Sequence, residues 1–115
     1  MAALVLAVGT AQATWSIVIV NTRTREVGVA SATCLTNFDL QANTPVVIVG
    51  MGGATAQSAV DSDGTNRTFI RDGLYDLGAP ADILSGLSVF DPSHQSKQYG
   101  MVDTQIGRAS CRERV

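Results

Sequence analysis

The chain lacks the features that mark several common classes of protein. Its 115 residues include 8 basic and 10 acidic side chains, and the net charge of −2 offers no basic patch for nucleic-acid phosphates. Aromatic residues make up 5% of the chain, so neither base stacking nor a carbohydrate platform is indicated. No long charged or low-complexity run points to disorder, and 45% of the residues are hydrophobic. These features argue against a nucleic-acid partner and favour one packed domain, or part of one.

Cysteine is scarce as well. Cys111 lies in a segment at 106–115, IGRASCRERV, that matches the translation of one reading frame of a widely used sequencing adapter. We predict that this segment is a scar joined to the domain; the alternative is a basic tail of the protein itself. The remaining Cys34 alone cannot form an intrachain disulfide or a multi-cysteine zinc site. We expect Cys34 to be a buried, small apolar side chain.

The first 13 residues have the pattern of a secretory leader. The apolar run MAALVLAVG precedes Ala11-Gln12-Ala13, which places small residues at the −3 and −1 positions of a cleavage site. The positively charged start of such a leader is missing, and the run is too short to span a bilayer. The pattern predicts a truncated signal peptide over 1–13 and a secreted or periplasmic bacterial protein that begins at Thr14. The alternative is an ordinary buried strand or helix over Ala2–Val8.

Two β-hairpins are predicted after the leader. Residues 15–20 (WSIVIV) and 26–33 (EVGVASAT) are short and rich in β-branched residues, with a polar turn between them. Apolar residues on both faces of the first strand predict burial on both sides. The second hairpin, 46–49 and 54–60, bends at the run GMGG, which lacks the Lys-Ser/Thr of a phosphate-binding loop. Thr55 and Gln57 would share one face of its returning strand.

Two helices and a last strand follow. The apolar residues over 67–77 recur at helical spacing, namely Phe69, Ile70, Leu74 and Leu77. Gly78 would end this helix, and Pro80 would start a second one that continues over 81–89. Residues 98–103 return as a strand. Hairpins followed by paired helices, without an early βαβ unit, predict an α+β fold with helices covering an antiparallel sheet.

Two groups of polar residues invite a metal or catalytic interpretation. Residues 61–66 (DSDGTN) resemble the first half of a calcium loop, but the glycine is at the fourth place rather than the sixth. We interpret them as a turn whose Asn66 caps the next helix. His94 is the only histidine, which favours a solvated loop residue over a general base. We therefore predict no metal site and no cofactor.

Five stretches in order resemble one family, the domain of unknown function DUF1028, which is placed with the N-terminal-nucleophile (Ntn) hydrolases. They are Thr14–Val18, Glu26–Ala30, Gly50–Gln57, the paired helices with Asp91-Pro92, and Gln98–Asp103. The resemblance covers most of residues 14–105, which would be the N-terminal part of such a domain. It implies a four-layer α-β-β-α sandwich with antiparallel sheets, and it implies no established reaction.

The position of Thr14 suggests a chemistry for this fold. In an Ntn enzyme the hydroxyl of the first residue attacks a carbonyl, and its own α-amine, with a pKa of about 8, accepts the proton. Thr14 would be both nucleophile and base once the leader is removed. Ser31, Thr33 and Gln57 lie near strand ends and are candidate substrate-binding residues.

The leading hypothesis is therefore a secreted Ntn-type amidohydrolase that acts on C–N amide bonds of a small-molecule or peptide substrate. The alternative is a non-catalytic exported domain that binds cell-wall or peptide ligands on an Ntn scaffold. Neither hypothesis involves nucleic acid or a membrane span in the mature form, and both leave open a homo-oligomer.

Overall fold

The computed structural model describes residues 14–58, 61–105 and 109–112, which form six strands and three helices. The strands are β1 (Thr14–Val20), β2 (Val27–Thr33), β3 (Pro45–Ile48), β4 (Gly52–Ser58), β5 (Lys97–Asp103) and β6 (Ala109–Arg112). The helices are α1 (Leu40–Asn43), α2 (Thr65–Tyr75) and α3 (Pro80–Phe90), and a 3-10 turn, η1, covers His94–Ser96. Strands β1 and β2 form one antiparallel sheet, and β3-β4-β5-β6 form the other in that order. The predicted α+β class with antiparallel sheets is confirmed.

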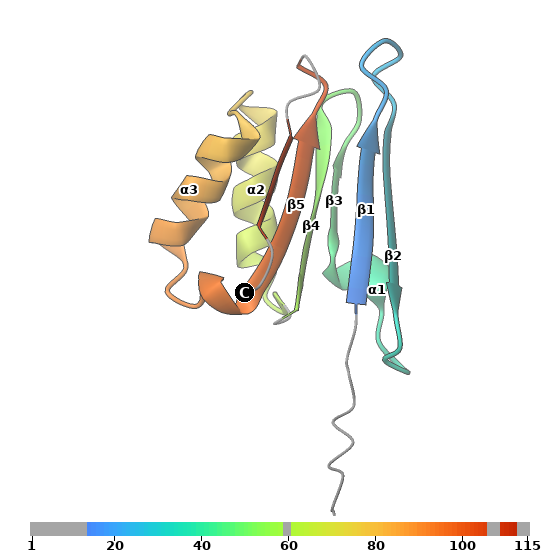
Figure 1. Ribbon diagram of the computed structural model, residues 1–115, viewed down its shortest axis with the longest axis vertical. Coiled ribbons are helices and arrows are strands. Elements are labelled where there is room, and N and C mark those ends of the chain that lie inside the picture. Colours follow the sequence, from blue (N-terminus) through green and yellow to red (C-terminus); the bar gives the residue numbers. More distant parts are fainter. Residues whose placement is uncertain (1–13, 59–60, 106–108, 113–115) are drawn as a thin grey trace, which may run out of the picture.

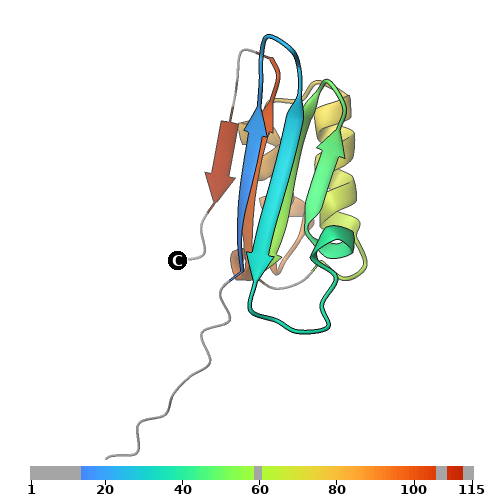
Figure 2. The ribbon, with the colours of Figure 1, turned by 90° about the vertical axis from the view of Figure 1, so that its right-hand side faces the viewer.

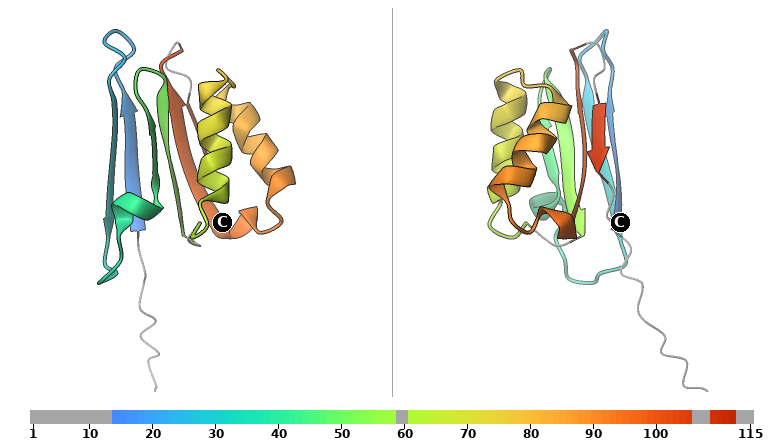
Figure 3. Two further views of the ribbon diagram at one scale, coloured as in Figure 1. Left: turned by 180° about the vertical axis from the view of Figure 1, so that it is seen from behind. Right: turned by 60° about the vertical axis from the view of Figure 1, so that its left-hand side comes forward.

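These elements lie in three layers (Figure 1). Helices α2 and α3 cover one face of the four-stranded sheet, and β1 and β2 stack on its other face, as both views in Figure 3 show. The stacking is close, because a Cβ added to Gly53 of β4 would lie 3.3 Å from a methyl group of Val18 on β1. Within the described ranges, none of the helices is long and apolar enough to cross a membrane.

The outer face of β1 has no layer packed against it among the described residues. Trp15, Ile17 and Ile19 point to this side, and they are 61%, 52% and 63% exposed. The alternate residues of β1 point inward toward the four-stranded sheet. The predicted burial of β1 on both faces is therefore wrong here, because one face alone has a partner sheet.

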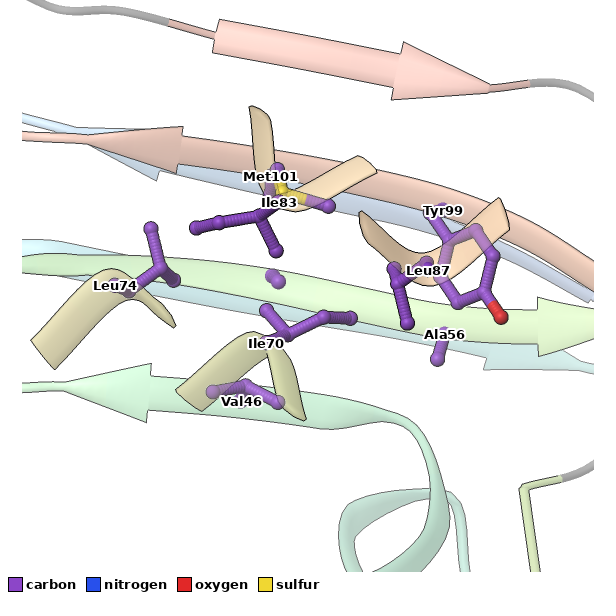
Figure 4. Packing of buried hydrophobic residues seen from close by; sticks show 9 residues of the cluster. Val46, Ala56, Ile70, Leu74, Ile83, Leu87, Tyr99 and Met101 are labelled. Atoms are coloured by element: carbon purple, nitrogen blue, oxygen red, sulfur yellow. The ribbon is translucent and has the colours of Figure 1, made fainter. Parts of the chain in front are cut away.

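The hydrophobic core lies between the four-stranded sheet and the two long helices (Figure 4). Its buried members are Val46, Ala54, Ala56, Ile70, Leu74, Ile83, Leu87, Tyr99 and Met101. The two alanines of β4 leave room for the helices to approach the sheet. Helices α2 and α3 also pack closely against each other, since a Cβ added to Gly73 would lie 2.8 Å from Ile83.

The glycine run between β3 and β4 forms the predicted tight turn. The N–H of Met51 donates to the carbonyl of Ile48 at 3.0 Å, and Gly50 has a φ of 74°, in the left-handed region. Gly52 lies directly against β5, where an added Cβ would be 2.7 Å from the carbonyl oxygen of Val102. Both glycines therefore have a structural role.

Helix α2 ends two residues earlier than predicted. Leu77, not Gly78, takes the left-handed conformation after the helix, with a φ of 61°. The N–H of Leu77 donates to Leu74 at 3.1 Å and that of Gly78 to Gly73 at 2.8 Å, which is the Schellman arrangement. The sequence grouped Leu77 with the apolar residues of this helix, but Leu77 lies beyond the end of α2 and is 56% exposed.

We expect Leu77→Gly to raise the free energy of unfolding by up to about 1 kcal/mol. A non-glycine residue in the left-handed region costs about 1–2 kcal/mol, part of which is offset by the greater freedom of glycine in the unfolded chain. Urea denaturation measures the change. Leu77→Ala keeps the Cβ and is the matched control, so equal stabilities of the two variants would contradict this account.

Two further segments differ from expectation. Cys34 is exposed rather than buried, because β2 ends at Thr33 and Cys34 begins the loop beyond the stacked sheets. Within the segment set apart as a scar, residues 109–112 form β6, an edge strand with Ala109 opposite Val102 of β5. The predicted leader at 1–13 lies outside the described residues.

Candidate functional site

Polar side chains from both sheets meet where β1 begins. Gln57 of β4 is buried and faces the two-stranded sheet. Its Nε2 donates to the backbone oxygen of Thr14 at 3.0 Å and to Oε1 of Gln98 at 2.9 Å. Its Oε1 accepts a hydrogen bond from Oγ of Ser16 at 2.5 Å. The side-chain amide of Gln57 on β4 is therefore hydrogen-bonded both to the first residues of β1 and to β5.

The hydroxyl of Thr14 faces that of Thr33 across the hairpin. The register pairs the two residues directly, and their Oγ1 atoms are 2.9 Å apart. The N–H of Leu35 also donates to Oγ1 of Thr33, at 3.2 Å. Because a hydroxyl has two acceptor lone pairs and one proton, Thr33 can still donate to Thr14 while it accepts from Leu35.

A second pair of hydroxyls lies one step further along the hairpin. Oγ of Ser16 is 2.8 Å from Oγ of its partner Ser31, which is 3.4 Å from Oγ1 of Thr44. Thr44 is buried and donates to the carbonyl of Leu40 at 2.8 Å. The alternation of hydroxyl and apolar residues in β1 thus places all its hydroxyls on the inner face.

The structure brings together the four residues singled out in the sequence, which are Thr14, Ser31, Thr33 and Gln57. Sequence reasoning missed three members of the same network: Ser16, Thr44 and Gln98. Ser16 had a detectable signal, because it shares the inner face with Thr14. Thr44 follows α1 and Gln98 lies on β5. Their positions relative to β1 depend on how the two sheets stack, which the sequence pattern does not predict.

A groove adjoins this network, between β1 and the pair β5 and β6. It consists of two pockets of about 320 Å³ and 140 Å³ that share Ser16, Thr55, Gly100 and Cys111. The larger pocket continues along Val18 and Val102, and the smaller one reaches Gln57. None of the described residues that line either pocket carries a charge at neutral pH. The site therefore offers hydrogen-bonding groups without a fixed charge.

The buried charges lie on the other face of the four-stranded sheet. Lys97 Nζ donates to Oδ2 of Asp91 at 2.8 Å, and Asn66 Nδ2 donates to the same oxygen at 2.7 Å and to the hydroxyl of Tyr99 at 2.6 Å. The hydrogen bond from Lys97, followed by that from Asn66, holds the pKa of Asp91 well below its usual value. Burial opposes the charged form of Lys97, but the hydrogen bond and charge of Asp91 outweigh it and raise the Lys97 pKa.

The calcium-like segment has a structural role in these contacts. Oδ1 and Oδ2 of Asp61 accept the backbone N–H groups of Asn66 at 3.2 Å and Arg67 at 2.9 Å at the start of α2. The prediction that Asn66 caps the helix is wrong, because Gly64 is the N-cap residue and Asn66 lies in the first turn, buried against Asp91. Over the described ranges, no group of three or more His, Cys, Asp or Glu residues could hold a metal ion.

Comparisons of the chain with protein-family models, curated proteins and solved structures give no match.

Proposed function

We propose that this protein is a secreted hydrolase on the Ntn fold that the DUF1028 resemblance implies, and that it cleaves C–N amide bonds with Thr14 as its nucleophile. The observation that carries the proposal is the setting of Thr14. This residue begins β1, Gln57 binds its backbone oxygen, and Thr33 lies within hydrogen-bond distance of its hydroxyl. A pocket with uncharged walls reaches Gln57, the residue that binds this backbone oxygen.

The fold class supports the same proposal. Two stacked antiparallel sheets with helices on one side would supply three layers of an α-β-β-α sandwich. The exposed face of Trp15, Ile17 and Ile19 is where a fourth layer would pack.

The chemistry requires removal of residues 1–13. Cleavage after Ala13 would give Thr14 a free α-amine, which can accept the proton of Oγ1 near neutral pH. Oγ1 would then add to the amide carbonyl carbon, and the C–N bond would break as the amine leaves with that proton. Water would hydrolyse the resulting ester on Thr14 and release the acid. Each step uses groups of Thr14 itself, while Gln57 and Thr33 hold it in place.

N-terminal sequencing and acylation by a β-lactone test this proposal. The exported protein should begin at Thr14. A β-lactone opens on an activated threonine hydroxyl, so it should add its whole mass to Thr14 of the processed chain and not react with Thr14 of the chain that retains residues 1–13. A different mature N-terminus, or equal reaction of both chains, would contradict the proposal.

The alternative function, a non-catalytic exported domain that binds cell-wall or peptide ligands, is favoured by the apolar outer face of β1. Three large side chains in a row are more than half exposed there. A processed chain that begins at Thr14, resists β-lactones and binds such a ligand would support this alternative.

A further inference from the structure

We infer that Thr33 takes part in the proposed reaction by donating a hydrogen bond to the attacking oxygen, Oγ1 of Thr14. This inference rests on the proposed function and deepens it, because it assigns the Thr33 hydroxyl to the nucleophile rather than to the substrate. The residues that carry it all lie within 14–105, so strand β6 has no part in it.

Thr14 and Thr33 lie side by side at one end of the hairpin. The register pairs them directly, and Figure 2 shows the start of β1 beside the end of β2. Their Oγ1 atoms are 2.9 Å apart, so one hydroxyl donates a hydrogen bond to the other. What this contact does for the reaction depends on which of the two is the donor.

The backbone N–H of Leu35 favours Thr33 as the donor. This N–H group can only donate, and its nitrogen lies 3.2 Å from Oγ1 of Thr33. The Thr33 oxygen is therefore already an acceptor, and its own proton is left to be given to a neighbour. Oγ1 of Thr14 is an acceptor within reach of that proton.

The α-amine that processing creates favours the same direction. In the processed chain the neutral amine of Thr14 accepts the proton of the Thr14 hydroxyl in the proposed reaction. A hydroxyl has one proton, so Thr14 cannot give it to the amine and to Thr33 at the same time. The arrangement that satisfies every group runs from the Leu35 N–H to Thr33, and from the Thr33 hydroxyl to Thr14.

The neighbouring pair of hydroxyls is directed toward Thr14 in the same way. Oγ of Ser16 donates to Oε1 of Gln57, so Ser16 accepts the proton of Ser31 instead of giving its own to Ser31. Gln57 in turn donates from Nε2 to the backbone oxygen of Thr14 at 3.0 Å. Both oxygens of Thr14 are therefore acceptors, and the Thr14 hydroxyl proton remains available for the α-amine.

A hydrogen bond donated to Oγ1 of Thr14 stabilises the negative charge that develops on this oxygen. As the proton moves to the α-amine, Oγ1 becomes similar to an alkoxide, and a hydrogen bond to a charged oxygen is roughly twice as strong as one between neutral groups. The same donor helps the second half of the reaction, because Oγ1 leaves again when water hydrolyses the ester. Thr33 should therefore accelerate both steps without contacting the substrate.

The test measures acylation of the processed chain by a β-lactone over a series of concentrations. Thr33→Val should lower the maximal rate constant at least about tenfold and leave the half-maximal concentration unchanged, because the lost hydroxyl contacts the attacking oxygen. Thr33→Ala removes the same hydroxyl with a smaller side chain and should give the same result. Thr33→Ser retains the hydroxyl and should stay within about threefold of the unchanged protein.

A matched control removes a hydroxyl of the same kind far from Thr14. The Thr24 hydroxyl lies in the exposed turn between β1 and β2 and donates to Glu26 at 2.6 Å. Thr24→Val should therefore leave both the maximal rate constant and the half-maximal concentration unchanged.

Exchange of the Leu35 amide proton in deuterated water gives a readout that needs no reaction. In Thr33→Val this N–H loses its acceptor and should exchange at least about tenfold faster. Thr33→Ser keeps the acceptor and should keep the slower exchange.

Three results would overturn the inference. The first is an equal maximal rate constant for Thr33→Val and the unchanged protein. The second is a change in the half-maximal concentration alone, which would assign Thr33 to binding of the ligand. The third is unchanged exchange of the Leu35 amide proton in Thr33→Val.

These outcomes also separate the two proposals. If β-lactones acylate Thr14 at a rate that does not depend on Thr33, the hydrolase proposal stands and the role of Thr33 fails. If the processed chain resists β-lactones, the hydrolase proposal fails, and the role of Thr33 in the reaction fails with it.

Discussion

Thr14→Ala in the processed chain is expected to abolish acylation by β-lactones and to lower any amide hydrolysis by a factor on the order of 10⁴ or more. The substitution removes the only atom proposed to attack the carbonyl and keeps the α-amine. Its cost in stability should be small, since one hydrogen bond to Thr33 is lost, worth about 0.5–1.5 kcal/mol. Intact-protein mass spectrometry and a thermal unfolding curve measure the two effects.

Two further variants identify the role of the Thr14 hydroxyl. Thr14→Ser retains the nucleophilic oxygen and should still be acylated. Thr33→Val is close to threonine in shape and removes the neighbouring hydroxyl, so it should slow acylation without preventing it. Continued acylation of Thr14→Ala at the same rate would show that another nucleophile reacts.

Lys97→Met is expected to lower the free energy of unfolding by about 3 kcal/mol at pH 7. The pair of Lys97 with Asp91 is about nine-tenths buried, and loss of one partner leaves the other charge without compensation. We take the lower end of the usual range because the pair borders an open pocket. Urea denaturation of the single variant and of Asp91→Asn/Lys97→Met measures the coupling, and the double variant should recover most of the loss.

The same pair gives the protein a defined dependence on pH. The pKa of Asp91 is lower in the folded protein, so its charge contributes full stability above its unfolded pKa of about 3.9. That contribution is lost as the pH falls from there through the lower folded value. The pKa of Lys97 is raised, so its contribution persists up to about pH 10.4 and is lost as the pH rises through the folded value.

Denaturation at pH 7 and pH 3 checks this dependence. The gap in stability between the unchanged protein and Asp91→Asn should be narrower at pH 3, because protonation of Asp91 in the unfolded chain offsets the advantage of its charge. A gap that is the same at both pH values would show that Asp91 is not stabilised as its charged form.

Local pattern was sufficient to predict most of the secondary structure and part of the site. Hydroxyl and apolar residues alternate in β1 and β2, so any antiparallel register that pairs Thr14 with Thr33 also pairs Ser16 with Ser31. The same two-residue period also placed Gln57 on one face of its strand together with Thr55. These residues needed only the two-residue period of a strand.

The parts that were missed depend on contacts between distant elements. Gln98 joins the network because β5 pairs with β4, which places Gln98 directly opposite Gln57. Thr44 joins it because the residue that follows α1 lies next to Ser31. Asn66 looked like a cap, yet the helix begins at Thr65, Asp61 accepts the N–H group of Asn66, and the Asn66 side chain donates to Asp91. Leu77 took the left-handed position that the sequence suggested for Gly78.

The bare outer face of β1 has a spectroscopic consequence. Trp15 is the only tryptophan of the chain, and it lies on that face with 61% of its surface in contact with solvent. Its fluorescence emission is therefore that of a hydrated indole while the face is open. Any layer that covers the face, whether a helix, a ligand or a second molecule, shifts the emission to shorter wavelength. The chain thus contains its own optical reporter of whether that side of the hairpin is occupied.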